Sequence, residues 1–414
     1  MKPLHDDVGP IWLDVTRLVS RIGLGPMTGI DRVELAYLVH LTTLGDPDTR
    51  FVTRTTRGFL LLDHVGGRIL ADLARGEREP GRADAMSRLA GRGARPRHRV
   101  EATLRSVAVG RCTKWGLHGL LTRSKGPVTY INTGHSNLSD RVLAAFSSRP
   151  LTQVAVLVHD LIPLTHPQFV VPDQPAIFAG RIDRVRRHAD LVICNSAATK
   201  AGLVAHWGGN GPHPALAVAH LGVDLLPKAD AERDRGHIVM LGTIEPRKNH
   251  ALMLDVWEAL AREIPATDLP QLHIIGRPGW RMDDIMARVR THPLLGHALH
   301  YHGPLPDAEV ASHLARAGAL VFPSLAEGYG YPPLEAAHAG ALPICSDLPV
   351  FRETLGDCAV YVKNADLYSW LETIKKYVVG NVEAPDLARF NVPSWADHFS
   401  QVGKALTHDQ GEGP

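Results

Sequence analysis

The sequence predicts an α/β protein of two Rossmann-like domains that face each other across a cleft. Short apolar segments of strand length alternate with helical stretches along the chain, a pattern typical of parallel sheets flanked by helices. The segments are residues 128–132, 154–159, 191–195, 215–218, 238–241, 272–275, 318–322 and 342–345. The chain has 414 residues, which is enough to bury two substantial cores.

A charged passage divides the apolar segments into two series. Residues 227–236 read PKADAERDRG, and we interpret this passage as an interdomain linker. The first domain is therefore expected at residues 1–226 and the second at residues 227–392. A last helix is expected from Ser394, within residues 393–414.

The composition is typical of a soluble globular protein and demands no nucleic-acid partner. Lys and Arg number 45 against 43 Asp and Glu, which gives a formal net charge of +2. No apolar run reaches the length of a membrane span and the first residues do not resemble a signal peptide, so we expect a cytoplasmic location. Cys112, Cys194, Cys345 and Cys358 show no paired metal-ligand spacing, so neither a disulfide framework nor a zinc site is indicated.

A glycine-rich loop near the start is the first candidate site element. Residues 23–34 (GLGPMTGIDRVE) follow a strand predicted at residues 11–15, and a helix is expected to begin at about Gly29. The backbone N–H groups at the start of that helix would face the cleft and attract an anion. Such a loop is a weak signal alone, because a mobile loop explains the same composition.

Residues 51–125 carry a marked excess of basic residues. Sixteen Arg and Lys stand against six acids, with a basic cluster at residues 92–99 (RGARPRHR) and apolar residues in between. The region could rest on anionic lipid, which would suit an enzyme with a lipid-linked substrate. A solvated face with a flexible loop at residues 76–93 explains the pattern as well, whereas RNA binding is disfavoured because stacking aromatics are missing.

Three further segments place polar residues directly after apolar strands. In VAVLVHDLIP (residues 154–163), His159 and Asp160 follow the strand, and Asp160 could either orient the imidazole or cap the next turn. In IVMLGTIEPRKN (residues 238–249), Arg247 and Lys248 precede a helix from about His250, where two cations could hold a diphosphate.

The third segment, FPSLAEGYGYPPLE (residues 322–335), crosses from a buried strand into a helix. Its glycines permit a sharp turn, and Pro332 and Pro333 favour the first helical turn, so Glu327 and Glu335 bracket the crevice beyond the strand. Taken alone, Glu335 fits a first-turn helix acid and Glu327 a solvated loop residue equally well.

These segments together resemble glycosyltransferase family 4, whose members have the GT-B fold. Glu327 and Glu335 have the E-x7-E spacing of retaining members, and GTIEPRKN and VHDLIP are similar to the donor loop and the HDL-x-P segment. One departure is Thr243, where many members have Arg directly after the glycine. The final PSWADHFSQVGKAL resembles the GT-B tail that crosses back to the first domain.

The resemblance implies a role for each matching residue. The catalytic set would be His159, Arg247, Lys248 and Glu327, with Glu327 near the hydroxyls of the donor sugar and Glu335 on the ribose of the nucleotide. Donor binding would involve Gly29, Thr243, Arg247, Lys248, Gly276, Glu327, Gly328, Tyr329, Gly330, Tyr331 and Glu335, and the acceptor side would involve Thr28, Arg32 and Asp160.

The predicted reaction is a metal-independent transfer of a hexose, with mannose or rhamnose favoured, from a nucleoside diphosphate sugar to a saccharide acceptor in surface polysaccharide synthesis. The resemblance implies retention at the anomeric carbon, and a lipid-linked acceptor is expected. No cofactor beyond the nucleotide sugar is expected. GDP-mannose is the first choice of donor, and a dTDP- or UDP-sugar the second. Asp46 and Asp48 formally spell the D-x-D motif of metal-dependent transferases, but a turn is favoured because Pro47 lies between them. The alternatives are a sugar-nucleotide epimerase of the same fold and a non-catalytic scaffold in a polysaccharide assembly complex.

Overall fold

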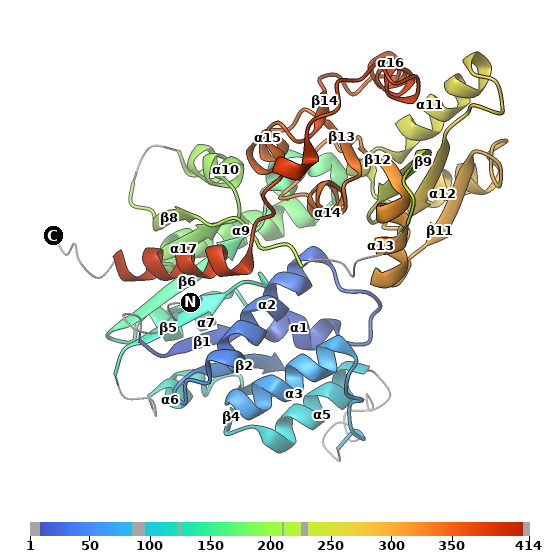
Figure 1. The fold of residues 1–414 in the computed structure, drawn as a ribbon. Helices are drawn as coiled ribbons and strands as arrows, with labels where there is room; N and C mark the ends of the chain where they lie inside the picture. Colours follow the sequence, from blue (N-terminus) through green and yellow to red (C-terminus); the bar gives the residue numbers. More distant parts are fainter. Residues whose placement is uncertain (1–8, 85–95, 123–125, 209–210, 225–230, 409–414) are drawn as a thin grey trace.

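The computed structural model describes residues 9–84, 96–122, 126–208, 211–224 and 231–408, and it contains two α/β domains, each built on a largely parallel sheet (Figure 1). The predicted fold class is therefore confirmed. The boundary predicted between residues 226 and 227 lies outside the described residues, and the domain limits stay predictions.

The first sheet has eight strands in the order β4-β3-β2-β1-β5-β6-β7-β8. The strands are β1 (Ile11–Asp14), β2 (Arg50–Thr55), β3 (Gly58–Leu62), β4 (Gly110–Cys112), β5 (Val128–Asn132), β6 (Thr152–Val158), β7 (Leu191–Cys194) and β8 (Ala215–Val218). The helices are α1 (Thr16–Arg21), α2 (Gly29–Leu44), α3 (His64–Arg75), α5 (Pro96–Val107), α6 (Leu117–Leu121), α7 (Asp140–Ser147), α8 (Ile162–Thr165), η1 (Pro167–Phe169), α9 (Gln174–His188) and α10 (Ala197–Trp207).

The expectation of parallel pairing is wrong at one edge of this sheet. β3 runs antiparallel to both β2 and β4, and Thr55 pairs with Gly58 across a turn of two residues. So short a connection permits only antiparallel strands, whereas a parallel pair needs a long crossover. The basic region thus forms a hairpin with its helices. Of the predicted basic cluster at residues 92–99, residues 92–95 lie outside the described residues and residues 96–99 begin α5.

The second sheet has six parallel strands in the order β11-β10-β9-β12-β13-β14. The strands are β9 (Asp234–Leu241), β10 (Gln271–Ile275), β11 (Leu299–Gly303), β12 (Ala317–Phe322), β13 (Leu342–Ser346) and β14 (Val360–Val362). The helices are η2 (Pro246–Lys248), α11 (His250–Glu263), α12 (Asp283–Arg290), α13 (Asp307–Arg316), α14 (Tyr331–Ala339), α15 (Pro349–Leu355), α16 (Leu367–Val378) and η3 (Leu387–Arg389).

This strand order places a topological switch point between β9 and β12, where ligands bind in Rossmann-like folds. β9 begins at Asp234, earlier than predicted, so the expected linker at residues 227–236 is partly strand. The reason is that β9 lies in the centre of the sheet, and Asp234 pairs with Ala317 of β12. β11 and β14 were not predicted from the sequence.

The last helix, α17 (Trp395–His408), packs on the first domain, as the sequence predicts (Figure 1). His398 of α17 is fully buried, and its Nε2 lies 2.7 Å from the hydroxyl of Tyr37 on α2. One apolar cluster runs from Leu41 through Phe399 to Phe351, so both domains share part of a core. The chain therefore crosses between the domains twice.

Two smaller predictions can also be checked. The Asp46-Pro47-Asp48 segment is a turn between α2 and β2, in which Asp46 Oδ1 accepts a hydrogen bond of 2.9 Å from the Asp48 N–H. None of the four cysteines, all of which lie in the described residues, forms a disulfide. Among the described residues, no helix combines the length and apolar content that a membrane span requires.

Candidate active site

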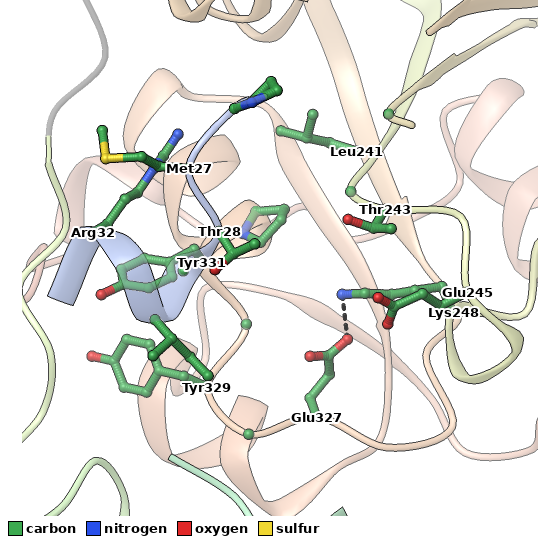
Figure 2. Close-up of a pocket in the computed structure, with 18 of the residues that line it drawn as sticks. Met27, Thr28, Arg32, Leu241, Thr243, Glu245, Lys248, Glu327, Tyr329 and Tyr331 are labelled. Atoms are coloured by element: carbon green, nitrogen blue, oxygen red, sulfur yellow. Dashed lines mark hydrogen bonds and ion pairs between the residues drawn. The ribbon is translucent and has the colours of Figure 1, made fainter. Parts of the chain in front are cut away.

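A buried triad of charges occupies the switch point of the second sheet. η2, after β9, supplies Arg247 and Lys248, and the loop after β12 supplies Glu327. Glu327 Oε2 lies 2.7 Å from Arg247 Nη1, and its Oε1 is paired with Lys248 Nζ (Figure 2). The sequence predicted all three as site residues, and the sheet topology brings them together from positions 79 residues apart.

The protonation of the triad follows from its burial and its charges. Burial alone would raise the pKa of Glu327, but Arg247 and Lys248 outweigh burial and lower it to about 2. Burial lowers the pKa of Lys248 to about 8, although the charge of Glu327 acts to raise it. Glu245, whose Oε2 lies 3.0 Å from Arg247 Nε, helps Glu327 to hold the pKa of Arg247 above its usual value. The triad thus has two cations near neutral pH but only one internal carboxylate.

Glu335 forms an ion pair across the cleft that the sequence did not reveal. It lies in the first turns of α14, and its Oε1 accepts from Arg32 Nη1 of the first domain at 2.9 Å. Burial raises the pKa of Glu335, although Arg32 partly opposes this. Arg32 also lies 3.4 Å from Asp307 of α13. The carboxylate predicted to bind ribose therefore holds an arginine here, and the pair links the two domains.

The first domain contributes His159 to the cleft. His159 follows β6 and is buried, and its Nε2 lies 2.6 Å from the carbonyl oxygen of Thr133. Burial lowers its pKa to about 4, so the ring is neutral and Nε2 must donate to that carbonyl. Of the two roles considered for Asp160, the structure shows the capping contact, in which its Oδ1 accepts from the N–H of Ile162 at 2.9 Å.

Glycines allow the backbones of the cleft to approach closely. Gly276 has a φ of +153°, and a Cβ there would lie 1.9 Å from the carbonyl oxygen of Gly242. A Cβ on Gly328 would lie 2.7 Å from the carbonyl oxygen of His159, so this glycine lets the two domains touch. Gly29 begins α2 and faces Tyr331, which Figure 2 shows beside the start of that helix.

The aromatic residues of the turn also join the domains. Tyr329 donates its hydroxyl to the carbonyl oxygen of Leu221 at 2.7 Å, and it meets Tyr331 edge to face at 5.4 Å between ring centroids. Thr28 caps α2, and its N–H donates to Asp31 at 2.8 Å. The sequence assigns Tyr329 and Tyr331 to donor binding and Thr28 to the acceptor side, so these contacts fix residues of both predicted sides of the cleft.

A cavity of about 510 Å³ lies between the domains, and every predicted site residue lines it. Its lining also contains residues that the sequence reasoning missed, among them Arg17, Asn195 and Arg277. Asn195 directly follows β7 and Arg277 follows β10, so a search of every strand end would have found both. The roles of the lining residues stay predictions.

Elsewhere, three imidazoles have the spacing of metal ligands. His237 on β9, His273 on β10 and His313 on α13 offer ligand atoms that all lie within 4.8 Å of one another. Burial and the neighbouring imidazoles lower the pKa of His273 to about 2, so its ring is neutral. None of the three lines the cleft. The sequence reasoning did not foresee this group.

Comparison with known proteins agrees with the geometry. The family described as "Glycosyl transferases group 1" matches residues 225–385. The serotype-specific mannosyltransferase WbdA of Escherichia coli is 33% identical over 224 residues, which cover 50% of this chain but 27% of the relative. The chain thus spans about a quarter of the length of the first curated relatives that it matches.

Solved structures match the whole chain. HepE of Anabaena in complex with UDP has a TM-score of 0.57 and 13% identity, and the match covers 97% of both chains. The lipopolysaccharide outer core galactosyltransferase WaaB has a TM-score of 0.56 and 14% identity, with 96% of this chain and 99% of WaaB covered. At such low identity these structures establish the fold alone. Residues 225–385 are therefore similar to the glycosyl transferases group 1 family, and the two domains have the GT-B fold.

Proposed function

We propose that the protein is a retaining hexosyltransferase that moves a sugar from a nucleoside diphosphate sugar to a saccharide acceptor in surface polysaccharide synthesis. The observation that carries the proposal is the buried Arg247–Lys248–Glu327 triad at the β9–β12 switch point, facing His159 from the other domain. The diphosphate would lie against the two cations, since switch points are the usual nucleotide sites of such sheets.

The leaving group would be stabilised by charge. As the bond between the anomeric carbon and the diphosphate oxygen breaks, negative charge grows on the diphosphate, and Arg247 and Lys248 are fixed before this happens. The N-terminus of α2 at Gly29 adds backbone donors on the opposite wall. These groups would supply the charge that a divalent cation supplies elsewhere, so we expect EDTA to leave the rate unchanged.

The acceptor oxygen would attack from the face that the diphosphate leaves. Its proton would pass to the departing phosphate oxygen, and the configuration would be retained. Glu327 is held by two cations, which makes it a positioning group for sugar hydroxyls rather than a nucleophile. His159 donates through Nε2 to Thr133, so its Nδ1 is free to accept from a sugar hydroxyl.

Donor entry would require the cross-domain pair to open. Glu335 would release Arg32 and accept hydrogen bonds from the ribose, while Arg32 would turn towards the acceptor side. GDP-mannose is the proposed donor, because the sequence favours it and because WbdA, which matches half of this chain, is named a mannosyltransferase. A dTDP- or UDP-sugar is the second choice.

The proposed acceptor is lipid-linked, with the basic first-domain region against an anionic membrane. Support comes from Trp115, which is 69% exposed and has Arg141 over its ring at 3.7 Å. The predicted cytoplasmic location remains a prediction.

The function can be tested by transfer assays with purified Glu327→Ala and Lys248→Ala proteins. Both substitutions should reduce turnover by orders of magnitude while the folded fraction, measured by circular dichroism, stays high. Glu245→Ala is the matched control, because it removes a cleft carboxylate whose one ion pair among the described residues is with Arg247. Near-full activity in either test variant would refute the assignment.

A further inference from the structure

The first sheet has a switch point of its own, and a second cavity opens there. The chain leaves β1 towards β2 on one side, while β5 lies on the other side of β1. A cavity of about 300 Å³ lies beyond the ends of these strands. It is lined by Arg17 after β1, Arg54 on β2, residues 134–139 after β5, and Arg181 and Arg184 on α9. Crevices at such positions are the usual ligand sites of open α/β sheets.

Four guanidinium groups surround this cavity, and among the described residues three of them form no ion pair. Arg17 is paired with Asp31 at 2.8 Å. Within the described part of the chain, Arg54, Arg181 and Arg184 form no ion pair, although Arg184 Nε donates to the carbonyl oxygen of Leu138 at 2.8 Å. Burial, together with repulsion from Arg184 and Arg17, lowers the pKa of Arg181. The cavity therefore has a large uncompensated positive charge.

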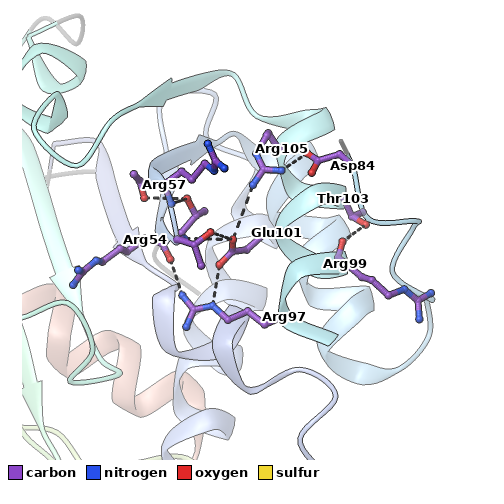
Figure 3. Close-up of polar contacts among 11 residues, drawn as sticks. Arg54, Arg57, Asp84, Arg97, Arg99, Glu101, Thr103 and Arg105 are labelled. Carbon is purple, nitrogen blue, oxygen red and sulfur yellow. Dashed lines mark hydrogen bonds and ion pairs between the residues drawn. The ribbon is translucent and has the colours of Figure 1, made fainter. Parts of the chain in front are cut away.

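Neighbouring contacts do not neutralise that charge. Figure 3 shows the side chain of Arg54 pointing away from the network of Arg97, Glu101 and Arg105, which contacts Arg54 only through its backbone carbonyl. On α7, Asp140 forms an ion pair with Arg187 at 2.9 Å and does not line the cavity, so it compensates only part of the charge of Arg184, which together with Arg187 lowers the pKa of Asp140.

Two buried acids lie beneath the loop after β5 without lining the cavity. Asp14 accepts from Tyr130 at 2.8 Å and from Asn137 at 2.9 Å, and Glu34 accepts from the N–H of Leu18 at 2.8 Å. Burial raises the pKa of both carboxyl groups, which favours their neutral forms.

We propose that this cavity binds a phosphate or diphosphate group carried by the acceptor. Planar guanidinium forks bind phosphate oxygens in pairs, and several unpaired cations match a multiply charged phosphoanion better than a carboxylate. The hydroxyls of Ser136 and Ser139 add neutral donors to the lining. The inference rests on the proposed transferase function, because it assigns the cavity to the acceptor.

The cavity is close enough to the cleft for this role. Arg17 lines both cavities. His135 of the second cavity lies 5.1 Å, between ring centroids, from His159 of the cleft. An acceptor held by its phosphate group would thus present its sugar hydroxyl beside the donor.

The test is calorimetric titration with inorganic pyrophosphate while a nucleoside diphosphate saturates the donor cleft. The wild-type protein should bind pyrophosphate, and the Arg54→Gln/Arg181→Gln double variant should bind at least about tenfold more weakly, because two charge-assisted contacts are lost. Arg187→Gln is the control, since it removes the same charge from α9 outside the cavity. Equal affinity in the wild type and the double variant, or no binding at all, would overturn the inference.

Titration with decyl diphosphate distinguishes a lipid-linked diphosphate from a free phosphoanion as the ligand of the cavity. The acceptor assignment requires it to bind at least as tightly as inorganic pyrophosphate and to depend on the same arginines. Binding of inorganic pyrophosphate alone would mean a site for free phosphoanions and would overturn the assignment. If no nucleotide binds the cleft, the proposed function fails, and titration of the free protein and its arginine variants still decides whether the cavity binds phosphoanions.

Discussion

Replacing Glu327 with glutamine should destabilise the second domain by an amount that the structure defines. Glutamine has the shape of a protonated glutamate, so the substitution removes only the charge that Arg247 and Lys248 hold. The pKa of Glu327 falls from 4.5 in the unfolded chain to about 2 in the folded protein. At about 1.4 kcal/mol per pH unit, this corresponds to about 3 kcal/mol of stability at pH 7.

The stability difference between wild type and Glu327→Gln should depend on pH in a definite direction. A lowered carboxyl pKa stabilises the folded state above pH 4.5, and the stabilisation is lost as the pH falls from 4.5 towards 2. The gap between wild type and Glu327→Gln should therefore be about 3 kcal/mol at pH 7 and about half of that near pH 3.

Urea unfolding followed by tryptophan fluorescence measures this gap, because Trp257 and Trp370 are fully buried in the second domain. Glu245→Gln is the control: Glu245 is a partly exposed partner of Arg247, and its loss should cost less than about 1 kcal/mol. A gap below about 1 kcal/mol at pH 7 for Glu327→Gln, or a gap that widens on acidification, would refute the reasoning.

Three further outcomes follow from the cleft. Because the pKa of Lys248 is about 8, kcat/KM should fall as the pH rises through 8. The Lys248→Arg substitution should move that fall to higher pH. An unchanged profile of kcat/KM against pH in this variant would contradict the prediction. The Gly276→Ala protein should melt at a clearly lower temperature than the Gly296→Ala protein. Both glycines have a positive φ, but a Cβ on Gly296 would meet open space, whereas a Cβ on Gly276 would meet the backbone. Equal melting temperatures would argue against a steric cause. The Glu335→Gln substitution should weaken nucleotide binding by about tenfold in calorimetry, since a charged acceptor for the ribose hydroxyls is lost. The Arg32→Ala substitution should not weaken nucleotide binding. Unchanged affinity in the Glu335→Gln protein would rule out the ribose role of Glu335.

The sequence predicted the buried parallel strands of both domains. These strands read as continuous apolar runs, so β5, β7, β10, β12 and β13 were found nearly to the residue. β11 and β14 lie at the edges of the second sheet and are only partly buried, and they were missed. β2 and β3 were missed because they lie in the basic region and form a hairpin whose turn, Thr56–Arg57, contains neither Gly nor Asn.

The candidate site was predicted residue by residue, whereas its pairings were not. Strand ends and glycines are visible in a sequence, and all of the predicted residues line one cavity. The pairs Arg32–Glu335 and Lys248–Glu327 join distant positions, so only the folded chain reveals them. The arginine-lined cavity was also hidden, because its members come from α1, β2, the loop after β5 and α9 and share no local pattern.

The central claim is that the cleft binds a nucleoside diphosphate through Lys248. The most direct measurement is a thermal-shift titration of wild-type and Lys248→Ala protein with GDP, UDP, dTDP and ADP, since a ligand of the folded state raises the melting temperature. A shift is expected with one nucleotide, GDP first, and it should be lost or strongly reduced in the variant. No shift with any nucleotide, or an equal shift in both proteins, would contradict it.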